Sequence, residues 1–527
     1  MTHSVSFNDK AFLAAGLGAL LFGASSFRQA SAQGATEPIW PTKEWQTSSP
    51  EEQGIDSREL AKLVDFGATG SLDSLLVVRH GRIVTEAYYA PYTAGIPHAV
   101  FSTVKAVTST LIAIASKDGL LDSPSHRVLD FFDRRNIANV DHRKEAITVQ
   151  TLLNMTSGLD WKQPPGGWPE SMFEMERSPD WVKFVLDRPM ASAPGDVFYY
   201  SNGNGHLLSA IVTKLSGMSA LEYANAKLFC PLGINGVSWV HDPQGISNGG
   251  RGLYLQPRDM AKIGYLWLRK GAWEDKQLFA SDWIDKMIQA TVDPQMPGEP
   301  ELRYSNLFWI LSDKHVYAAA GYHDQVIMVF PELDIVAVTT GRDNHPLSKL
   351  AEYILASVKL DKALTFETAG ASLLAKRIRD VSTEKPNAVG VTPGIAATIS
   401  GKVYRFPPNA ISVKSLSLIL TDQQPRYDME IYSKDETKSG PRLAGPIGLD
   451  GRYRKGEPTY LYESSICGVN AVKGTWQDDH TFVIDRLILG EGQPATRWFL
   501  TFDGGKLNIR TALEDGHEIS VDSEMGS

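Results

Sequence analysis

The chain contains few cysteines and no excess of basic residues. Its 527 residues include two cysteines, Cys230 and Cys467, and 52 Lys+Arg stand against 61 Asp+Glu, a net charge of -9. Two distant cysteines form neither a metal-ligand cluster nor a disulfide framework, although one long-range bridge between them stays open. Because an acidic chain lacks the basic surface that neutralises phosphates, we expect no nucleic-acid partner.

Long apolar runs and paired metal ligands are also missing. After the N-terminal segment, no stretch approaches the roughly 18 uncharged apolar residues of a membrane span, so we expect no stable membrane anchor in the mature chain. The 12 histidines show no H-E-x-x-H spacing. We therefore predict neither a metal nor a cofactor.

The N-terminal segment has the pattern of an export signal. Lys10 precedes the uncharged apolar run Ala11–Phe22, and Ala30-Ser31-Ala32 is a small-residue cleavage pattern. An apolar run of about 12 residues is too short to cross a bilayer. We predict a signal peptide over residues 1–32 and an exported, periplasmic mature protein.

The remaining chain divides into two regions by its residue patterns. Strand-like runs lie at both ends of a mostly helical region, which indicates an α+β domain over residues 40–362 whose single sheet is completed by both ends. Short alternating runs separated by turn residues predict an all-β domain, a barrel or sandwich, over 394–527. The polar stretch 363–393, which contains proline and glycine, is predicted to be a linker.

Periodicity also predicts individual elements. Helices are expected at 102–117, 181–186, 205–215, 257–270 and 347–360, and strands at 74–79, 82–89, 307–312, 316–320, 326–330 and 335–340.

The strongest chemical signal is Ser102-Thr103-Val104-Lys105. A serine and a lysine three residues apart share one face of a helix, so the amine can contact the hydroxyl. At a helix start, free N–H groups favour a developing alkoxide on Ser102. Burial among apolar residues lowers the proton affinity of Lys105, which can then act as a base. The motif alone is common, and most examples are surface pairs.

Tyr200-Ser201-Asn202 lies on a loop before the helix predicted at 205–215. A phenol at this place can relay a proton between Lys105, Ser102 and a leaving group. The Asn202 amide can orient Lys105 or the substrate. Taken alone, Tyr200 would be interpreted as a packed turn aromatic, so its role depends on its neighbours.

Together these motifs resemble those of the β-lactamase-related serine hydrolases, which include class C β-lactamases, D,D-peptidases, carboxylesterases and 6-aminohexanoate-dimer hydrolases. The matching segments follow the family's order at 50–54 (PEEQG), 102–105 (STVK), 152–159 (LLNMTSGL), 200–202 (YSN), 231–234 (PLGI) and 321–325 (GYHDQ). The resemblance implies a five-stranded antiparallel sheet flanked by helices, with a helical subdomain. It also implies an acyl-enzyme on Ser102, with Lys105 as the base and Tyr200 as the proton shuttle.

The segment Gly321-Tyr322-His323-Asp324-Gln325 departs from the family's usual Lys-Thr-Gly, His-Thr-Gly or Gly-Gly-Gln forms. We expect a backbone N–H near Asp324 or Gln325 to complete an oxyanion hole with that of Ser102. An Asp324 carboxylate in the cleft would repel substrate carboxylates. This disfavours β-lactams and D-alanyl peptides, unless His323 restores a positive charge.

Two further segments mimic catalytic motifs. Residues 245–249 (GISNG) fit G-x-S-x-G but lack the strand before and the helix after that a nucleophile elbow requires, so we interpret them as a glycine-rich loop. Tyr304-Ser305-Asn306 repeats the Tyr-x-Asn pattern, but it runs into a predicted strand. We expect it to be pocket wall or core.

The sequence thus predicts a serine hydrolase of small esters or amides. The candidates for orienting the substrate are Asn202, Tyr322, His323, Asp324, Gln325 and Trp168. One alternative is a penicillin-binding D,D-peptidase or β-lactamase. Another is a non-catalytic ligand-binding or sensor module, against which the full set of Ser102, Lys105 and Tyr200 speaks.

Overall fold

The structure is a computed structural model that describes residues 38–163, 169–289, 292–296, 298–433, 440–460, 467–513 and 516–524. By their contacts, residues 39–527 belong to one unit. The predicted signal peptide lies outside the described residues, as does Trp168. None of the helices in the described ranges combines the length and the apolar character that a membrane crossing requires.

A sheet of eight strands forms the centre of the N-terminal domain, in the order β1-β3-β2-β13-β12-β11-β10-β9. Its strands are β1 (Gln46–Thr47), β2 (Leu72–Arg79), β3 (Arg82–Tyr88), β9 (Leu302–Ser305), β10 (Phe308–Leu311), β11 (Val316–Gly321), β12 (Gln325–Phe330) and β13 (Ile335–Gly341). Neighbours pair antiparallel except β1 and β3, which are parallel. The pairing of β2 with β13 confirms that both ends of the domain complete one sheet.

The sheet has more strands than the five that the resemblance implied, and the difference lies at its two edges. β1 adds a parallel strand of two residues beyond β3. β10 and β9 extend the other edge, beyond β11. The β9 strand includes Tyr304, so the second Tyr-x-Asn segment belongs to this edge of the sheet.

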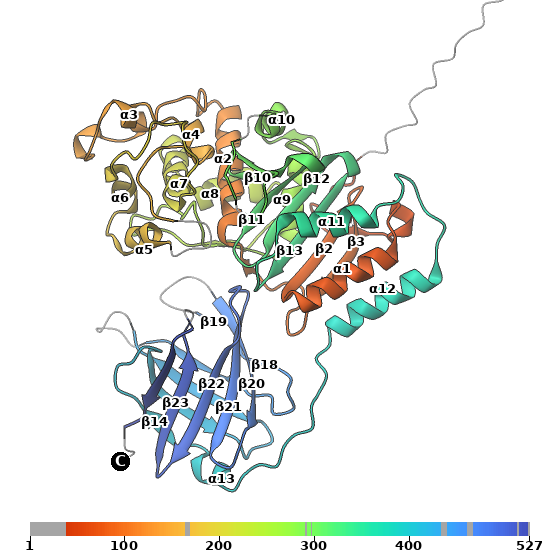
Figure 1. Cartoon of the computed structure of the whole chain (residues 1–527), viewed down its shortest axis with the longest axis vertical. Helices are drawn as coiled ribbons and strands as arrows, with labels where there is room; N and C mark the ends of the chain where they lie inside the picture. The colour runs from red at the N-terminus through yellow and green to blue at the C-terminus, as the bar shows by residue number, and fades with distance from the viewer. Residues whose placement is uncertain are drawn as a thin grey trace, which may run out of the picture. The chain divides into compact units, whose positions relative to one another are not determined.

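Three helices cover one face of the sheet: α1 (Ser57–Thr69), α11 (Leu347–Ser357) and α12 (Thr368–Val381) (Figure 1). On α1, Leu60, Leu63 and Val64 recur at helical spacing and are fully buried. The Asp56 side chain caps the first turn of α1. Because α12 packs against α1, this part of the range 363–393 is helical and not the linker that its composition predicted.

Helix α9 (Pro257–Leu268) packs against β2, β12 and β13. Proline at its first position agrees with the predicted start, and the helix ends at Leu268, two residues before the predicted end. Gly271, with φ of +83°, follows in the turn after the helix. A Cβ atom on Gly264 would lie 2.6 Å from side-chain carbons of Ile327 and of Val336. Only glycine therefore lets this helix approach the sheet so closely.

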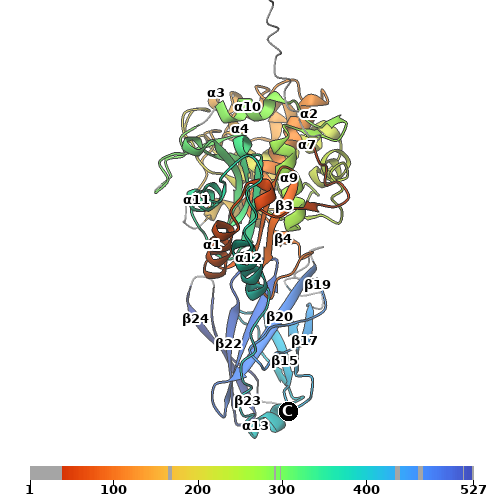
Figure 2. The same cartoon turned by 90° about the vertical axis from the view of Figure 1, so that its right-hand side faces the viewer.

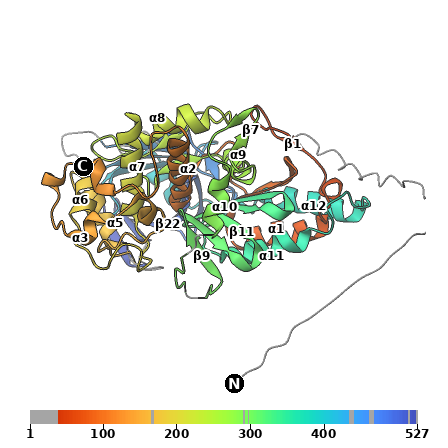
Figure 3. The same ribbon diagram turned by 90° about the horizontal axis from the view of Figure 1, so that it is seen from above.

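A second group of helices forms the helical subdomain that the resemblance implied. They are α2 (Val104–Lys117), α3 (His142–Glu145), α4 (Val149–Leu153), α5 (Glu170–Arg177), α6 (Trp181–Asp187), α7 (Asn202–Ser216) and α8 (Ala220–Ala224). A further helix, α10 (Asp282–Gln289), forms an ion pair through Asp285 with Lys270, just after α9. α2 is buried over most of its length and packs against α7 and α8, beside which it lies in Figure 3. The predicted helix at 102–117 begins with a 3-10 turn, Phe101–Thr103, and the one predicted at 205–215 begins earlier, at Asn202.

Short strands complete the N-terminal domain. β4 (His98–Ala99), β6 (Leu253–Leu255) and β5 (Ser238–Trp239) form a sheet of three strands, and β7 (Ala272–Trp273) pairs with β8 (Lys276–Gln277).

In its described residues, the C-terminal domain contains two antiparallel sheets and one short helix, α13 (Ile395–Ile399) (Figure 2). The first sheet contains β14 (Val403–Arg405), β15 (Val413–Ile419), β16 (Arg426–Ile431) and β17 (Arg442–Pro446). The second contains β18 (Arg454–Lys455), β19 (Thr459–Tyr460), β20 (Cys467–Trp476), β21 (Thr481–Leu489), β22 (Thr496–Asp503), β23 (Lys506–Ala512) and β24 (Glu518–Asp522). Leu416 and Met429 of the first sheet share one core with Phe482 and Leu500 of the second. The prediction of an all-β domain is confirmed apart from the short helix.

We predict that Gly264→Val destabilises the N-terminal domain, because the added carbons collide with Ile327 and Val336. Overpacking of this kind costs about 1–3 kcal/mol in the free energy of unfolding. Chemical unfolding followed by tryptophan fluorescence measures the change. Gly394→Val is the control, because a Cβ atom there meets nothing within 4 Å. Equal losses of stability in the two variants would contradict the prediction.

Candidate active site

Ser102 lies in the short 3-10 turn Phe101–Thr103 that leads into α2. The turn is fixed from both sides, because the Val100 N–H donates to Leu253 O at 2.9 Å and the Thr103 N–H donates to Val100 O at 3.0 Å. Phe101, directly before the serine, has φ of +43°, in the left-handed region that residues with a side chain rarely adopt. Backbone strain of this kind is typical of functional sites.

Lys105 is buried, with 1% of its surface exposed, and its amine contacts three oxygen atoms. Nζ lies 3.0 Å from Ser102 Oγ, 2.6 Å from Asn202 Oδ1 and 2.8 Å from Gly250 O. The expected contact of the amine with the serine hydroxyl is therefore present. Asn202 orients the lysine by accepting one of its hydrogen bonds.

The surroundings of Lys105 favour its neutral form. Burial lowers the pKa of the Lys105 amine well below its ordinary value, and the positive charge of Arg251 lowers it further. A neutral amine has two N–H groups and one lone pair. The two N–H groups donate to Asn202 Oδ1 and Gly250 O. The lone pair is left for the Ser102 hydroxyl. The arrangement can thus remove the proton from the serine.

Tyr200 lies next to both residues. Its ring centroid is 4.7 Å from Lys105 Nζ. Burial raises the pKa of the Tyr200 phenol, and a hydrogen bond with Ser102 partly opposes this rise. The phenol is therefore protonated near neutral pH. Trp309 stacks on its ring at 6.1 Å, and Tyr304 packs edge-on at 6.3 Å, so the prediction that Tyr304 belongs to a wall or core is confirmed.

The Leu152–Leu159 motif holds the loop that carries Tyr200. The Tyr199 N–H donates to Met155 O at 2.8 Å, and the Ser201 N–H lies 3.4 Å from Met155 Sδ. Ser201 in turn caps α7, because its hydroxyl accepts a hydrogen bond from the Asn204 N–H. Asn202 therefore begins the helix with its side chain fixed toward Lys105.

The sequence did not identify Gly250 as a site residue. Its carbonyl reaches Lys105 because the loop beside it packs directly on α7: a Cβ atom on Gly249 would lie 2.0 Å from Gly205 O, and one on Gly205 would lie 2.6 Å from Gly249 O. Adjacent glycines that follow a loop signal close backbone approach, and this was the available clue. Ser247 in the same loop is buried, and its Oγ accepts a hydrogen bond from the Leu221 N–H, so the loop interpretation is confirmed.

The strand that meets the serine does so through Gly321, at the end of β11. A Cβ atom on Gly321 would lie 2.3 Å from Val100 O and 3.0 Å from Ser102 N. β10 pairs with β11 only along residues 316–318, so the end of β11, residues 319–321, extends past this paired part. We therefore expect the oxyanion donor of this strand near Gly321, and not near Asp324 or Gln325 as the sequence predicted.

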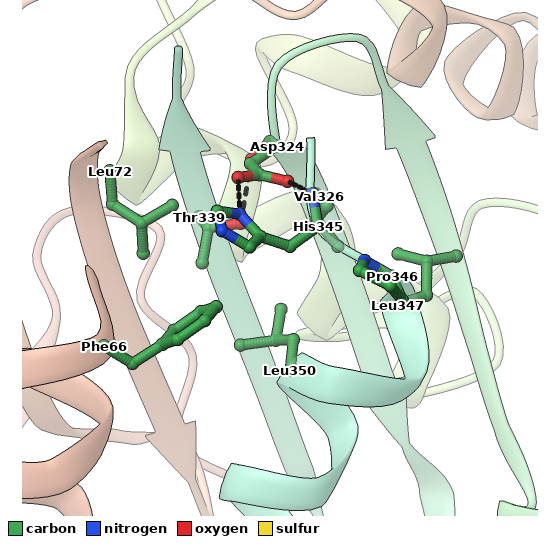
Figure 4. A pocket seen from close by; sticks show the side chains of 9 residues that line it. All are labelled: Phe66, Leu72, Asp324, Val326, Thr339, His345, Pro346, Leu347 and Leu350. Carbon is green, nitrogen blue, oxygen red and sulfur yellow. Dashed lines mark hydrogen bonds and ion pairs between the residues drawn. The ribbon is translucent and has the colours of Figure 1, made fainter. Parts of the chain in front are cut away.

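Asp324 does not face this cleft. Its carboxylate accepts hydrogen bonds from the His345 N–H at 2.8 Å and from His345 Nδ1 at 2.6 Å. Figure 4 shows both residues with Phe66 and Leu350, which come from α1 and α11. The carboxylate thus lies on the sheet face that these helices cover. The expected repulsion of substrate carboxylates by Asp324 is wrong, because the turn before β12 directs the side chain to this face.

The other residues of the 321–325 segment have separate positions. Tyr322 is 55% exposed and packs edge-on against Phe101, beside the nucleophile. His323 is buried and contacts Gly492 O through Nδ1, so its imidazole is not a free cation in the cleft. Gln325 is fully buried, and its amide donates to His323 O at 2.7 Å and to Gly341 O at 2.9 Å. Gln325 therefore fixes the turn.

The described residues contain one free thiol and no candidate metal centre. Within the described ranges, no group of three or more His, Cys, Asp and Glu side chains could hold a metal ion. Cys230 is an exposed free thiol, and the side chain of Cys467 lies outside the described residues.

A sheet flanked by helices, with the lysine–serine contact beside the end of β11, is the fold of β-lactamases and their transpeptidase relatives. A family model described as Beta-lactamase matches residues 69–358, more than half of the chain. The chain belongs to the beta-lactamase family, and it is a hydrolase of that fold.

Individual relatives are distant. The 6-aminohexanoate-dimer hydrolase of Paenarthrobacter ureafaciens is 21% identical over 287 residues, which are 50% of this chain and 71% of the relative. The octameric penicillin-binding protein homologue from Pyrococcus abyssi has a TM-score of 0.43 and 16% identity, over 88% of this chain and 99% of its own. EstCE1, a hydrolase with promiscuous acyltransferase activity, has a TM-score of 0.46 and 17% identity, over 62% of this chain and 99% of its own.

We predict that Lys105 makes stability rise with pH. Since its pKa is lower in the folded than in the unfolded chain, folding releases a proton at pH values between the two, and the cost of this release falls as the pH approaches the ordinary lysine value. Relative to Lys105→Met, the wild type should gain up to about 1.4 kcal/mol per pH unit in this window. Unfolding free energies of both proteins between about pH 7 and pH 10 measure the gain. A constant difference would contradict the prediction.

Proposed function

We propose that this hydrolase cleaves small esters or amides by acyl transfer to Ser102. The observation that carries the proposal is the buried Lys105 amine, 3.0 Å from Ser102 Oγ, with its other contacts made to the neutral oxygens of Asn202 and Gly250. Because burial lowers the pKa of Lys105 well below its ordinary value, this amine is a better candidate for the base than an exposed lysine. A binding or sensor module would need no such base beside a strained serine turn.

In the first half of the reaction, Ser102 Oγ attacks the substrate carbonyl carbon and its proton passes to Lys105 Nζ. The carbonyl oxygen becomes an oxyanion, for which the backbone N–H groups of Ser102 and of Tyr322, the residue after Gly321, are the proposed donors. The closeness of Gly321 to Ser102 N supports this pair. No side chain is required for the role, so the unusual residues at 322–325 do not prevent it.

In the second half, the bond to the leaving group breaks and Tyr200 supplies its proton. The phenol donates to the leaving oxygen or nitrogen and is reprotonated from the Lys105 ammonium, which returns to the neutral amine. The raised pKa of Tyr200 supports this neutral relay. Water then attacks the acyl-enzyme carbonyl, its proton passes to the same base, and Ser102 Oγ leaves with a proton to yield the acid product.

The substrate class is inferred from the residues that border the cleft. The last three residues of β11 before Gly321 are alanines at 318–320, where a β-lactamase or D,D-peptidase of the Lys-Thr-Gly type has a cation for the substrate carboxylate. This supports esters or amides without such a carboxylate over β-lactams and D-alanyl peptides. The name of the 6-aminohexanoate-dimer hydrolase, a distant relative, also supports a small substrate.

We predict that Ser102→Ala abolishes both fluorophosphonate labelling and turnover of a p-nitrophenyl ester, because the attacking oxygen is removed. Wild type should hydrolyse the ester, or a linear anilide, faster than a chromogenic cephalosporin. Labelling that persists in the variant would exclude Ser102 as the nucleophile. A cephalosporin hydrolysed faster than the ester and the anilide would favour the β-lactamase alternative.

We predict that Tyr200→Phe lowers kcat by about 100-fold or more, the usual scale for loss of a general acid. The loss should be larger for an anilide than for a p-nitrophenyl ester, because nitrophenolate leaves without a proton. Tyr199→Phe is the matched control, because Tyr199 precedes Tyr200 in the chain and its side chain is 40% exposed. Equal losses for both substrates would contradict the relay.

A further inference from the structure

A loop of the C-terminal domain lies against the segment that carries the nucleophile. This β21–β22 loop, residues 490–495, follows the buried end of β21. Its Gly490 carbonyl accepts a hydrogen bond from the Ala99 N–H at 2.7 Å, three residues before Ser102. A Cβ atom on Gly490 would lie 2.1 Å from Pro97 O, so the two backbones are in direct contact.

Gly492 of the β21–β22 loop contacts Phe101, directly before Ser102, and His323 and Gln325 in and after the turn that follows β11. A Cβ atom there would lie 2.7 Å from Phe101 Cε2 and 3.5 Å from Gln325 Nε2. Its carbonyl accepts a hydrogen bond from His323 Nδ1. Gly492 has φ of +67°, so both its conformation and its surroundings favour glycine. The loop thus contacts the residue before the nucleophile and the turn that follows β11.

Glu491 lies in the same loop, between Gly490 and Gly492. Its two carboxylate oxygens lie 3.1 and 3.2 Å from the hydroxyl of Tyr254, on β6, which donates to them. Arg251 is the cation whose charge acts on both Glu491 and Lys105, which places the three groups around one region. Arg251 forms its ion pair with Glu176.

The charges around Arg251 do not balance. When ionised, Glu176 and Glu491 contribute two negative charges against the one positive charge of Arg251. Burial raises the pKa of the Glu491 carboxyl, and the hydrogen bond from Tyr254 and the charge of Arg251 oppose this rise. Within the described part of the chain, Glu491 forms no ion pair of its own, and its side chain is only partly exposed to water. A carboxylate in such a place attracts a cation more strongly than one on the open surface, because water screens it less.

We propose that the β21–β22 loop is a wall of the active site, and that Glu491 makes the enzyme prefer acyl groups whose far end carries an ammonium over those that carry a carboxylate. The proposal rests on the acyl transfer to Ser102 proposed above. It gives the C-terminal domain a function, because this domain supplies a specificity-determining residue to the site of the other domain. Glu491, and not Asp324, is then the residue that selects substrates by charge.

The test compares three p-nitrophenyl esters of similar length, which end in a trimethylammonium, a methyl or a carboxylate group. Wild type should have the highest kcat/KM for the cationic ester and the lowest for the anionic one. Glu491→Gln keeps an acceptor for Tyr254 but removes the charge, and should lower the cation-to-anion ratio of kcat/KM about 10-fold, mainly through KM. Glu518→Gln on β24, an exposed glutamate of the same domain, is the matched control and should leave the ratio unchanged.

Two further measurements make the test independent of a single variant. Raising the salt concentration from about 20 mM to about 500 mM should reduce the wild-type preference for the cationic ester. Gly492→Ala should lower kcat for all three esters without changing their ratio, whereas Gly504→Ala, where a Cβ atom meets nothing within 4 Å, should not.

The outcomes separate this proposal from the proposed function. Ser102-dependent turnover of the neutral ester, with a cation-to-anion ratio that is the same in wild type and Glu491→Gln, would overturn the role of Glu491. A kcat that Gly492→Ala leaves unchanged would overturn the loop as a wall. Absence of any Ser102-dependent turnover in wild type would overturn the acyl transfer itself, and the selection of acyl groups with it.

Discussion

Burial of the Lys105 amine among neutral partners is the interaction on which the proposed chemistry depends. An ammonium group taken out of water without an anion beside it is so unfavourable that the neutral amine becomes the preferred form. Here the amine contacts two carbonyl oxygens and a hydroxyl. The packing that places α2 inside the domain therefore also creates the base, and no separate carboxylate has to hold it.

Close approach between backbones assembles the rest of the site. Gly250 brings a carbonyl to Lys105, Gly321 brings the end of β11 to Ser102, and Gly492 brings the C-terminal domain to the residue before the serine. In each case a Cβ atom would collide with a neighbouring residue or be forced closer than ordinary contact. Segments far apart in the chain thus meet at one place because glycine leaves room for them.

Gly490 and Gly492 connect the two domains by direct backbone contacts. Composition and periodicity separate the all-β domain from the catalytic domain, and the two have their own apolar cores. The β21–β22 loop nevertheless contacts the nucleophile segment and the turn after β11. In the proposed assignment, selection of the acyl group is therefore divided between domains that fold around separate cores, whereas the reacting groups belong to one.

The sequence by itself determined many of the elements and the residues proposed to react. Apolar periodicity located α9 and the strands β10 to β13, because local side-chain spacing decides how such segments bury their faces. The spacing of Ser102 and Lys105 placed both on one side of a helix turn. Only the tertiary structure decided the contacts of Gly250, Asp324 and Glu491. Their partners lie at least 20 residues away in the chain, and the direction of a turn or the contact of two loops depends on long-range packing that no local pattern contains.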